Sequence, residues 1–594
     1  MDIDASSYSL STPLAFVSEL PKTCLPTWTI DELPEPRKAG LRNLAGFIGP
    51  GIVMCGIQLA GGEWLLGAEI TARYGGSLMW LAAVAIIGQV FYNLECGRYA
   101  LYTGEPVFTG FMRAKPGPPF WIGILFLLSV GTFIPALSTQ AAAVLSALFL
   151  NRVPGEQDRW LVTTLSFVLL GAVSLPVLVG GKIYNMMQVV MTVKVFVVLG
   201  FCLTIGLLFV SPSNWGDVFS GFLKVGNVPV VAGEDRNGNG VLDPGEDFDR
   251  DGHLDVIEPV NERDKSGDVI AFQDLDGDGK WDGENVANLF VARFQDGEWP
   301  TLLLSQIALL GAFIGYAGGG GLGNATYSNY CRDKGWGMGA QVGAIPSAVG
   351  GRKVTLSHIG KVFELTDDNL RRWKGWWRTI LLDQWLIWAP GCVMGMALPA
   401  LLSIQFSPNS ALFHDRAGLD WAQAIISADG VRHDDMFGPA MQQGLWIAVL
   451  IIGLLVLLPS QMSIVEDVCR RWTDILWSGS RRVREQMQPS QVGRIYYTIL
   501  AFYVAWSFFC AWYFTKYESP KVMVLLIANL NNIGLGFSAF FILRNNLAYL
   551  PKQLRPSWTH RIGIIGCGVF YLGMAALVFY HKQLPILKAL LGAG

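Results

Sequence analysis

Acidic and amide side chains recur at short, regular intervals in one part of the chain. The first set starts at Asp235 and supplies oxygen ligands at loop positions 1, 3, 5, 9 and 12, with Gly240 at position 6 and a backbone carbonyl at position 7. A second set follows at once with the same spacing. Hard divalent cations such as Ca²⁺ prefer six to eight oxygen ligands around a sharp glycine turn. The spacing predicts two calcium sites, with the ligands Asp235, Asn237, Asn239, Val241, Asp243 and Glu246, then Asp247, Asp249, Asp251, His253, Asp255 and Glu258.

A third copy starts at Asp274 and departs from this EF-hand loop pattern at position 12, where Asn285 stands and Glu284 comes one place early. The first two loops abut without room for a helix between them. We therefore expect a compact loop ordered by Ca²⁺ as cofactor, rather than a sensor that opens a groove. The alternative is a solvated acidic loop without metal. The predicted ligands of the third, weaker site are Asp274, Asp276, Asp278, Lys280 and Asp282.

These motifs lie in residues 211–300, a stretch with 20 acidic and 7 basic residues and a net charge of −13. The whole chain of 594 residues is 52% hydrophobic and 15% charged, whereas soluble domains carry about 25% charged residues. Its 68 glycines and 21 tryptophans are typical of membrane helices, which approach closely at glycine and place tryptophan at the interfaces. The composition predicts an integral membrane protein with an acidic insert. The overall net charge of −3 argues against nucleic acid as a partner.

Eleven stretches are apolar enough to cross a bilayer, which takes about 20 residues. We predict an all-α membrane protein with an N-terminal segment (1–43), five transmembrane helices (44–210), the insert (211–300) and six more helices (301–594). The stretches are Leu44–Ala72, Leu78–Leu101, Phe120–Leu150, Trp160–Val179, Met187–Val210, Leu302–Gly321, Ile380–Leu402, Trp446–Ser463, Ile495–Phe514, Val522–Leu543 and Ile562–Phe579.

Lysine and arginine gather in alternate loops, where they mark the cytoplasmic side of a membrane protein. Basic residues precede span 1 and follow spans 2, 4, 6, 8 and 10, most densely between Arg332 and Arg378. The N-terminus is then cytoplasmic and the insert extracytoplasmic. We expect a multi-pass protein of a plasma membrane, the inner membrane of a bacterium, in contact with membrane lipid.

Glycine interrupts two of these spans near their centres. Span 1 contains Gly56 and the pair Gly61–Gly62, and span 6 contains the run Gly318–Gly321. Their separation by five spans is that of a LeuT-type inverted repeat, in which the first helix of each repeat unwinds in mid-membrane. The freed carbonyls and half-helix ends then bind the substrate. The alternative is close packing of unbroken helices through small residues.

Four short motifs lie in spans 1, 2, 8 and 10. They are Gly49-Pro50-Gly51 opening span 1, Arg98 to Gly104 closing span 2, Ser460 to Ser463 in span 8, and Phe541 to Asn546 ending span 10. With these motifs the chain resembles the NRAMP family of divalent-metal transporters along most of its length outside the insert. The resemblance implies an eleven-helix secondary transporter that works by alternating access.

The metal-binding residues of that family are replaced in this chain. The family's Asp-Pro-Gly-Asn in span 1 corresponds to Ala60–Glu63, and its Met-Pro-His-Asn in span 6 to Gly321–Asn324. Losing the soft thioether favours a hard ion such as Mg²⁺, Ca²⁺ or Mn²⁺. A carboxylate at bilayer depth is costly and marks a functional candidate, so Glu63 is predicted to act as cation ligand, as proton carrier, or as both. The alternative is an interfacial glutamate at the start of a half-helix. The predicted substrate-binding residues are Gln58, Ala60, Glu63, Gly318, Gly321, Asn324 and Asn529.

The leading hypothesis is a secondary transporter of a hard divalent cation with a calcium-binding extracytoplasmic loop. A small organic solute such as an amino acid is the first alternative, because unwound glycine segments leave room for a larger cargo. The second alternative is a non-transporting membrane receptor that displays the calcium loop. No enzyme is expected, since the sequence has no phosphate-binding loop, no paired histidine ligands and no nucleophile elbow.

Overall fold

The computed structural model describes residues 20–36, 49–59, 61–178, 182–230, 286–295, 297, 299–300, 302–348, 354–414 and 420–584. All the predicted calcium ligands, from Asp235 to Asp282, lie outside these ranges, as does Ala60. Glu63 lies on a described helix, but its side chain is outside the description. The calcium sites and the four-part division of the chain therefore stay predictions.

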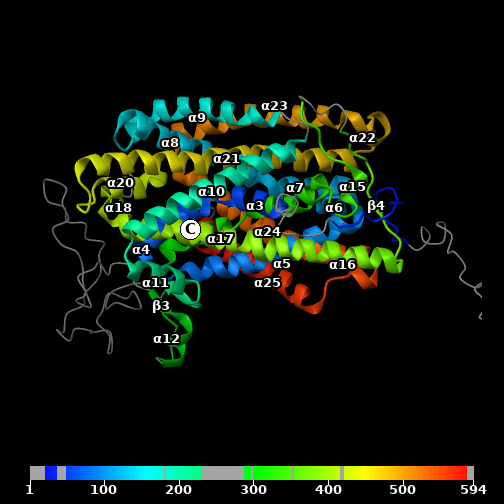
Figure 1. Cartoon of the computed structure of the whole chain (residues 1–594), viewed down its shortest axis with the longest axis horizontal. Helices are drawn as coiled ribbons and strands as arrows, with labels where there is room; N and C mark the ends of the chain where they lie inside the picture. Colours follow the sequence, from blue (N-terminus) through cyan, green and yellow to red (C-terminus); the bar gives the residue numbers. More distant parts are fainter. Residues whose placement is uncertain are drawn as a thin grey trace, which may run out of the picture.

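Long helices run side by side along the molecule (Figure 1). Among the described residues, nine helical segments are long and apolar enough to cross a membrane. A helix suits a bilayer because all its backbone groups bond within the segment. The helices in these segments are α5 (Met79–Thr103), α7 (Pro118–Ser129) with α8 (Ala136–Leu150), α9 (Arg159–Ser174), α10 (Ile183–Phe209), α16 (Asp367–Leu382) with α17 (Ala389–Phe406), α21 (Pro439–Gly479), α23 (Val492–Tyr517), α24 (Pro520–Tyr549) and α25 (Trp558–Val578).

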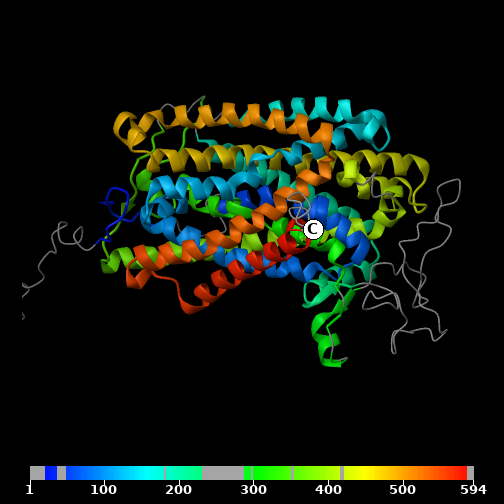
Figure 2. The same ribbon diagram turned by 180° about the vertical axis from the view of Figure 1, so that it is seen from behind.

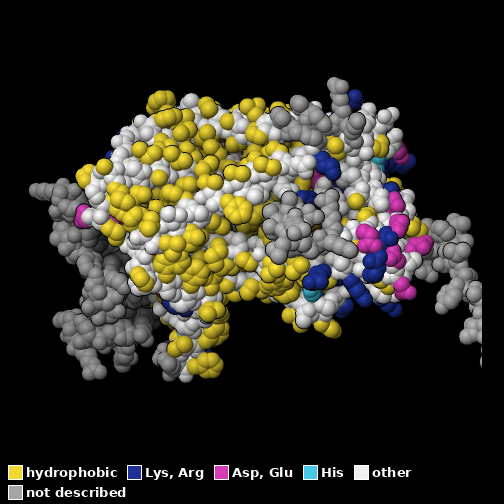
Figure 3. Space-filling model, in the orientation of Figure 1, with side chains coloured by type: hydrophobic (Ala, Val, Ile, Leu, Met, Phe, Trp, Pro, Cys, Tyr) yellow, Lys and Arg dark blue, Asp and Glu magenta, His cyan; other side chains and the backbone are white. Residues whose placement is uncertain are grey.

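Apolar side chains are spread over the face of the helices that the space-filling view shows (Figure 3). Trp160 on α9, Leu207 on α10 and Phe502 on α23 expose 70%, 69% and 74% of their surface. Many large apolar side chains exposed on neighbouring helices mark contact with membrane or another apolar partner. The exposed faces of these helices are therefore suited to lipid.

Two further helices are interrupted in the middle. The first consists of α3 (Pro50–Gln58), a π-helical turn (Gly61–Leu66) and α4 (Gly67–Tyr74). The second consists of α13 (Ile307–Tyr316), a 3₁₀ turn η7 (Gly321–Thr326) and α14 (Tyr327–Lys334). Residues 317–320 between α13 and η7 are not helical. The predicted breaks in spans 1 and 6 are confirmed, whereas the total of eleven spans stays a prediction.

Three long helices surround the breaks. α24 packs against α13 and η7, α21 against α3 and η7, and α5 against α14 and η7. The view from behind shows α24 next to α25, with which it shares the longest contact (Figure 2). This arrangement presents the side chains of α5, α21 and α24 to the unwound segments.

The remaining elements are short and lie at the ends of the bundle. A parallel pair joins β1 (Thr29–Ile30) to β4 (Lys361–Val362), and an antiparallel pair joins β2 (Asn227–Pro229) to β3 (Val286–Asn288). The second pair brings the two ends of the acidic insert together. The short helices are α6 (Val107–Arg113), α11 (Pro212–Gly221), α12 (Leu289–Gln295), α15 (Gly339–Val342), α18 (Ala411–His414), α20 (Ile426–Arg432) and α22 (Arg481–Gln486).

Candidate functional site

The two helix breaks touch each other, and glycine makes this approach possible. A Cβ atom on Gly62 would lie 2.4 Å from the carbonyl oxygen of Tyr316, the last residue of α13. A Cβ atom on Gly319 would lie 1.8 Å from the side-chain nitrogen of Gln58. Any larger side chain at either position would push the breaks apart. The two glycines therefore permit the close contact between the breaks.

Two glutamines hold the unwound segment of the second broken helix. Gln58 Nε2 donates to Asn324 Oδ1 at 2.8 Å. Gln89 Oε1 on α5 accepts from the Gly319 amide and from Asn324 Nδ2, each at 2.7 Å, and Gln89 Nε2 donates to the Ala317 carbonyl at 2.7 Å. A membrane interior leaves no water for such groups, so unwound backbone must find protein partners. Neutral amides supply them here.

A cavity of about 80 Å³ lies where the breaks meet. It is bounded by the end of α3, by residues 318–320, by the 3₁₀ turn η3 (Val130–Phe133), and by α21 and α24. In the described part of the chain, no hydrogen-bond donor reaches the carbonyl oxygens of Gly318 and Gly319. The polar side chains of the lining are mostly amides and hydroxyls: Gln58, Thr132, Thr326, Tyr330, Ser463, Asp467 and Asn531.

Asp467 is the one carboxylate among the described residues that line the cavity. Its side chain is 11% exposed. Thr326 Oγ1 donates to one carboxylate oxygen, and the Arg471 guanidinium, one helical turn along α21, pairs with the other. The guanidinium also approaches Thr132 Oγ1, at 3.5 Å. Asp467 therefore brings a negative charge to the cavity wall, partly neutralised by a cation behind it.

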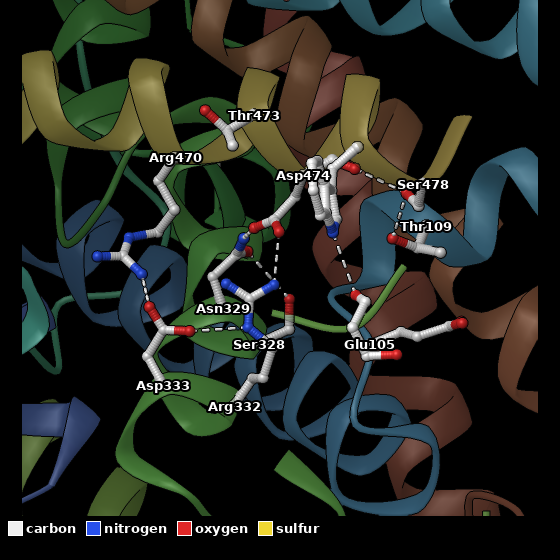
Figure 4. A network of polar contacts seen from close by, with 12 residues as sticks. Glu105, Thr109, Ser328, Asn329, Arg332, Asp333, Arg470, Thr473, Asp474 and Ser478 are labelled. Carbon is white, nitrogen blue, oxygen red and sulfur yellow. Dashed lines mark hydrogen bonds and ion pairs between the residues drawn. The ribbon is translucent and has the colours of Figure 1, made fainter. Parts of the chain in front are cut away.

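A cluster of buried ion pairs joins α14 to α21 beyond Asp467 (Figure 4). Arg332 lies between Asp333, at 2.7 Å, and Asp474, at 2.5 Å. Asn329 Nδ2 donates to the second oxygen of Asp474 at 2.5 Å, and Arg470 pairs with Asp333. All these side chains are at most a few per cent exposed. The cluster ties the half-helix that follows the second break to α21.

The predicted substrate-binding residues fall into three groups in the structure. Gln58 and Gly318 line the cavity. Gly321 and Asn324 stand next to it, and the Asn324 side chain is occupied by the two glutamines. Asn529 faces α13 instead, where its amide donates to the Ala308 carbonyl at 3.0 Å.

Ala60 and the Glu63 side chain lie outside the described residues, as stated above. Sequence reasoning overlooked Asp467 and Gln89. Span 8 was predicted to end at Ser463, but α21 continues to Gly479. The acid–base pairs Glu466–Arg470 and Asp467–Arg471, each four residues apart, are the signal that predicts this continuation.

Histidine, cysteine and acidic side chains, the common metal ligands, are scarce among the described residues near the breaks. Within the described ranges, no three His, Cys, Asp or Glu side chains come together to hold a metal ion. A cation in the cavity would depend on Asp467, on hydroxyl and amide oxygens, and on backbone carbonyls. Such a donor set suits hard ions. The thioether of Met54 on α3 is also part of the lining.

Comparisons with known proteins agree on the fold. The chain matches no family model, and no curated protein matches its sequence. A solved structure of a mutant manganese transporter from Eremococcus coleocola superposes with a TM-score of 0.54 at 10% identity, covering 94% of this chain and 94% of that one. The same transporter with an aromatic bis-isothiourea substituted compound gives 0.52 at 10% identity, covering 95% and 93%. At this identity the likeness shows the fold alone, and together with the nine membrane-length helices of the described residues it confirms the predicted all-α, multi-pass membrane fold.

Proposed function

We propose that the protein is a secondary transporter that moves a small hard divalent cation by alternating access. The observation that carries this proposal is the cavity between the two breaks, whose described wall holds one carboxylate, several neutral oxygen ligands and two backbone carbonyls that no described donor reaches. Ionisable side chains inside a membrane domain mark ion or substrate pathways by default. Asp467 is the proposed charged ligand.

The ends of the half-helices support a cation as cargo. Ile57 and Gln58 at the C-terminal end of α3 line the cavity, and so does Tyr316 at the C-terminal end of α13. The C-terminal end of a helix carries a partial negative charge, which attracts cations and repels anions. Two such helix ends beside the Asp467 carboxylate favour a cation as cargo. They disfavour an amino acid, whose own carboxylate would be repelled.

The size of the cavity supports an ion over an organic solute. Pockets for drug-sized organic molecules measure roughly 300–1,000 Å³, whereas this cavity measures about 80 Å³. A water needs only about 10–15 Å³ of such space. The cavity therefore suits an ion with some of its water ligands.

Cation flux in proteoliposomes tests the proposal. Mg²⁺, Ca²⁺ and Mn²⁺ are offered one at a time to wild type, to Asp467→Asn and to a control, Asp368→Asn, whose carboxylate is half exposed. We expect flux of at least one ion in the wild type and loss of this flux in Asp467→Asn. The control Asp368→Asn should carry the ion at the wild-type rate. A double variant, Asp467→Asn with Arg471→Gln, removes both charges and guards against a folding defect from an unpaired arginine.

Two results would overturn the proposal. One is wild-type protein that carries none of the three ions and gains no thermal stability from any of them. The other is unchanged flux in both Asp467 variants, which would move the site to other residues such as Glu63. Thermal stabilisation by amino acids without stabilisation by cations would favour an organic solute.

We further propose that residues 211–300 face the exterior and bind Ca²⁺, with the N-terminus in the cytoplasm. Glu32 pairs with Arg372 at 2.7 Å and Glu35 with Arg371 at 2.5 Å. These pairs place the N-terminal segment on the same side of the membrane as the basic segment between Arg332 and Arg378, as the proposed orientation requires. Charged side chains gather at the right-hand end of the face shown in Figure 3, near β4 and α16. A calcium chelator is expected to speed proteolysis between Asp235 and Asn285. Unchanged cleavage would contradict the calcium sites.

A further inference from the structure

An apolar finger stands off the side of the bundle at the base of the acidic insert. We define it as residues 223–229 and 286–295 together with Trp299. Both ribbon views show its helix, α12, beyond the outline of the long helices (Figures 1 and 2), and apolar side chains cover it in Figure 3. Six of its large apolar side chains expose 48–87% of their surface: Leu223, Val225, Phe290, Val291, Phe294 and Trp299. Neither the cavity nor the proposed transport function uses this element.

Hydrogen bonds hold the finger together. β2 and β3 form its root, and the Leu289 amide donates to the Gly226 carbonyl at 2.9 Å. Asn288 Oδ1 accepts from the amides of Phe290 and Val291, at 3.1 and 3.2 Å, and so caps the start of α12. A Cβ atom on Gly226 would lie 2.6 Å from the Phe290 ring, so this ring packs directly on the root. The apolar side chains are therefore displayed by a hydrogen-bonded element rather than by an irregular loop.

The root of the finger lies at the ends of two membrane-length helices. Trp80 Nε1, in the first turn of α5, donates to the Asn227 carbonyl of β2 at 2.8 Å. α10 ends at Phe209, and the short α11 leads from it to the finger. Helices that cross a bilayer run roughly along its normal, and the finger points across this direction, away from the helix axes (Figure 1). It therefore stays near the depth at which α5 and α10 leave the hydrocarbon.

The composition of the finger is that of an interfacial membrane segment. Residues 286–295 contain one charged side chain, Arg293, although they belong to an insert with a net charge of −13. Phe290 and Phe294 are four residues apart on α12 and therefore share one face of the helix. The Arg293 guanidinium carbon lies 6.0 Å from the centre of the Trp299 ring. Aromatic side chains beside an arginine whose charge reaches the headgroups are typical of membrane interfaces.

We propose that the finger inserts these apolar side chains into the interface of the bilayer and so holds the base of the acidic insert at the membrane surface. Lipid is the partner because the apolar surface of the bundle leads up to the finger: Leu207 and Leu208, near the end of α10, are 69% and 66% exposed. A second copy of the chain fits less well, since a stable protein interface takes about 20–30 residues a side. The inference depends neither on the cargo of the cavity nor on the predicted calcium sites.

Spin labels on the full-length protein in lipid nanodiscs test the inference. Cys24→Ser removes the one exposed cysteine, because the other eight are buried, and Phe294→Cys then places the label on the finger. Molecular oxygen concentrates in hydrocarbon and a nickel chelate stays in water, so the ratio of their collision rates with the label reports its surroundings. Phe502→Cys on α23 is the lipid reference, and Asp435→Cys, in an exposed turn before α21, is the aqueous reference.

We expect the oxygen-to-nickel ratio at position 294 to lie several-fold above the ratio at position 435 and close to that at position 502. A carboxylate on the finger should undo this, because a charge is costly in the apolar layer. With the label at Phe290→Cys, Phe294→Glu should lower the ratio to the aqueous value. Phe294→Leu is the matched control and should leave the ratio unchanged. Thermal unfolding should be the same in both variants, since the finger lies outside the bundle.

Three outcomes would overturn the inference. A ratio at position 294 equal to that at position 435 would put the finger in water. Low collision rates with both reagents would show that protein covers it. Spectral broadening that disappears on dilution with unlabelled protein would then identify a second copy, and the absence of broadening would identify the insert itself. A ratio that ignores Phe294→Glu would show that the apolar side chains do not set the depth of the finger. None of these measurements involves cation flux, so they stand apart from the test of the transport proposal.

Discussion

The helix breaks and the α14–α21 cluster satisfy buried polar groups in opposite ways. At the breaks, the neutral amide of Gln89 holds the unwound backbone, the side chain of Asn324 links it to Gln58, and a cavity remains beside them. In the cluster, arginines and carboxylates pair at 2.5–2.7 Å with little space between them. Neutral hydrogen bonds contribute modest net stability and are exchanged easily, whereas a broken buried ion pair leaves a costly charge. Breaking contacts should therefore cost less at the helix breaks than in the cluster.

The largest effect is expected in the cluster. Arg332→Gln leaves Asp333 and Asp474 without their shared partner, which should cost about 3–5 kcal/mol of stability. The control is Arg481→Gln, whose pair with Glu485 is 83% and 59% exposed and should contribute nothing measurable. Thermal unfolding in detergent measures both. Equal melting temperatures for the two variants would contradict the claim that the buried cluster contributes more stability than an exposed ion pair.

A smaller effect on stability, but a specific one on binding, is expected at the breaks. Gly319→Ala places a methyl group against Gln58 and Asn324 and should cost about 1–3 kcal/mol through overpacking. We also expect it to abolish thermal stabilisation by Mg²⁺, Ca²⁺ or Mn²⁺, the proposed cargo. Gly171→Ala on α9 is the matched control, because its methyl group meets no atom within 4 Å and the residue does not line the cavity. A Gly319→Ala protein that binds cations like wild type would show that the contact between the breaks is dispensable.

The smallest effect is expected for Met54, which carries the one sulfur atom among the described lining residues. Met54→Leu nearly conserves volume and should cost less than about 1.5 kcal/mol. If the cargo is a hard ion, stabilisation by Mg²⁺, Ca²⁺ or Mn²⁺ should remain within about twofold of wild type, since thioethers select softer metals. Selective loss of the Mn²⁺ response would identify Met54 as a ligand and shift the proposed cargo toward transition metals.

Some of the candidate site could be predicted from local sequence, and some could not. The two breaks were visible because consecutive glycines weaken a helix whatever surrounds them. That Asp467 reaches the cavity was not visible, because its pair with Arg471, four residues along, predicts only a longer helix, and its contact with Thr326 forms only in the folded state. Asn529 and Asn531 illustrate the same limit: they are two residues apart on α24, yet one faces α13 and the other the cavity.

The amino-acid sequence by itself determined the apolar helices and the places where two of them unwind. Both follow from side-chain hydrophobicity and backbone freedom, which are properties of a short segment. Only the tertiary structure decided which carboxylate reaches the cavity and which amides hold the freed backbone. These depend on the rotation and crossing of helices hundreds of residues apart, and no local pattern encodes that geometry.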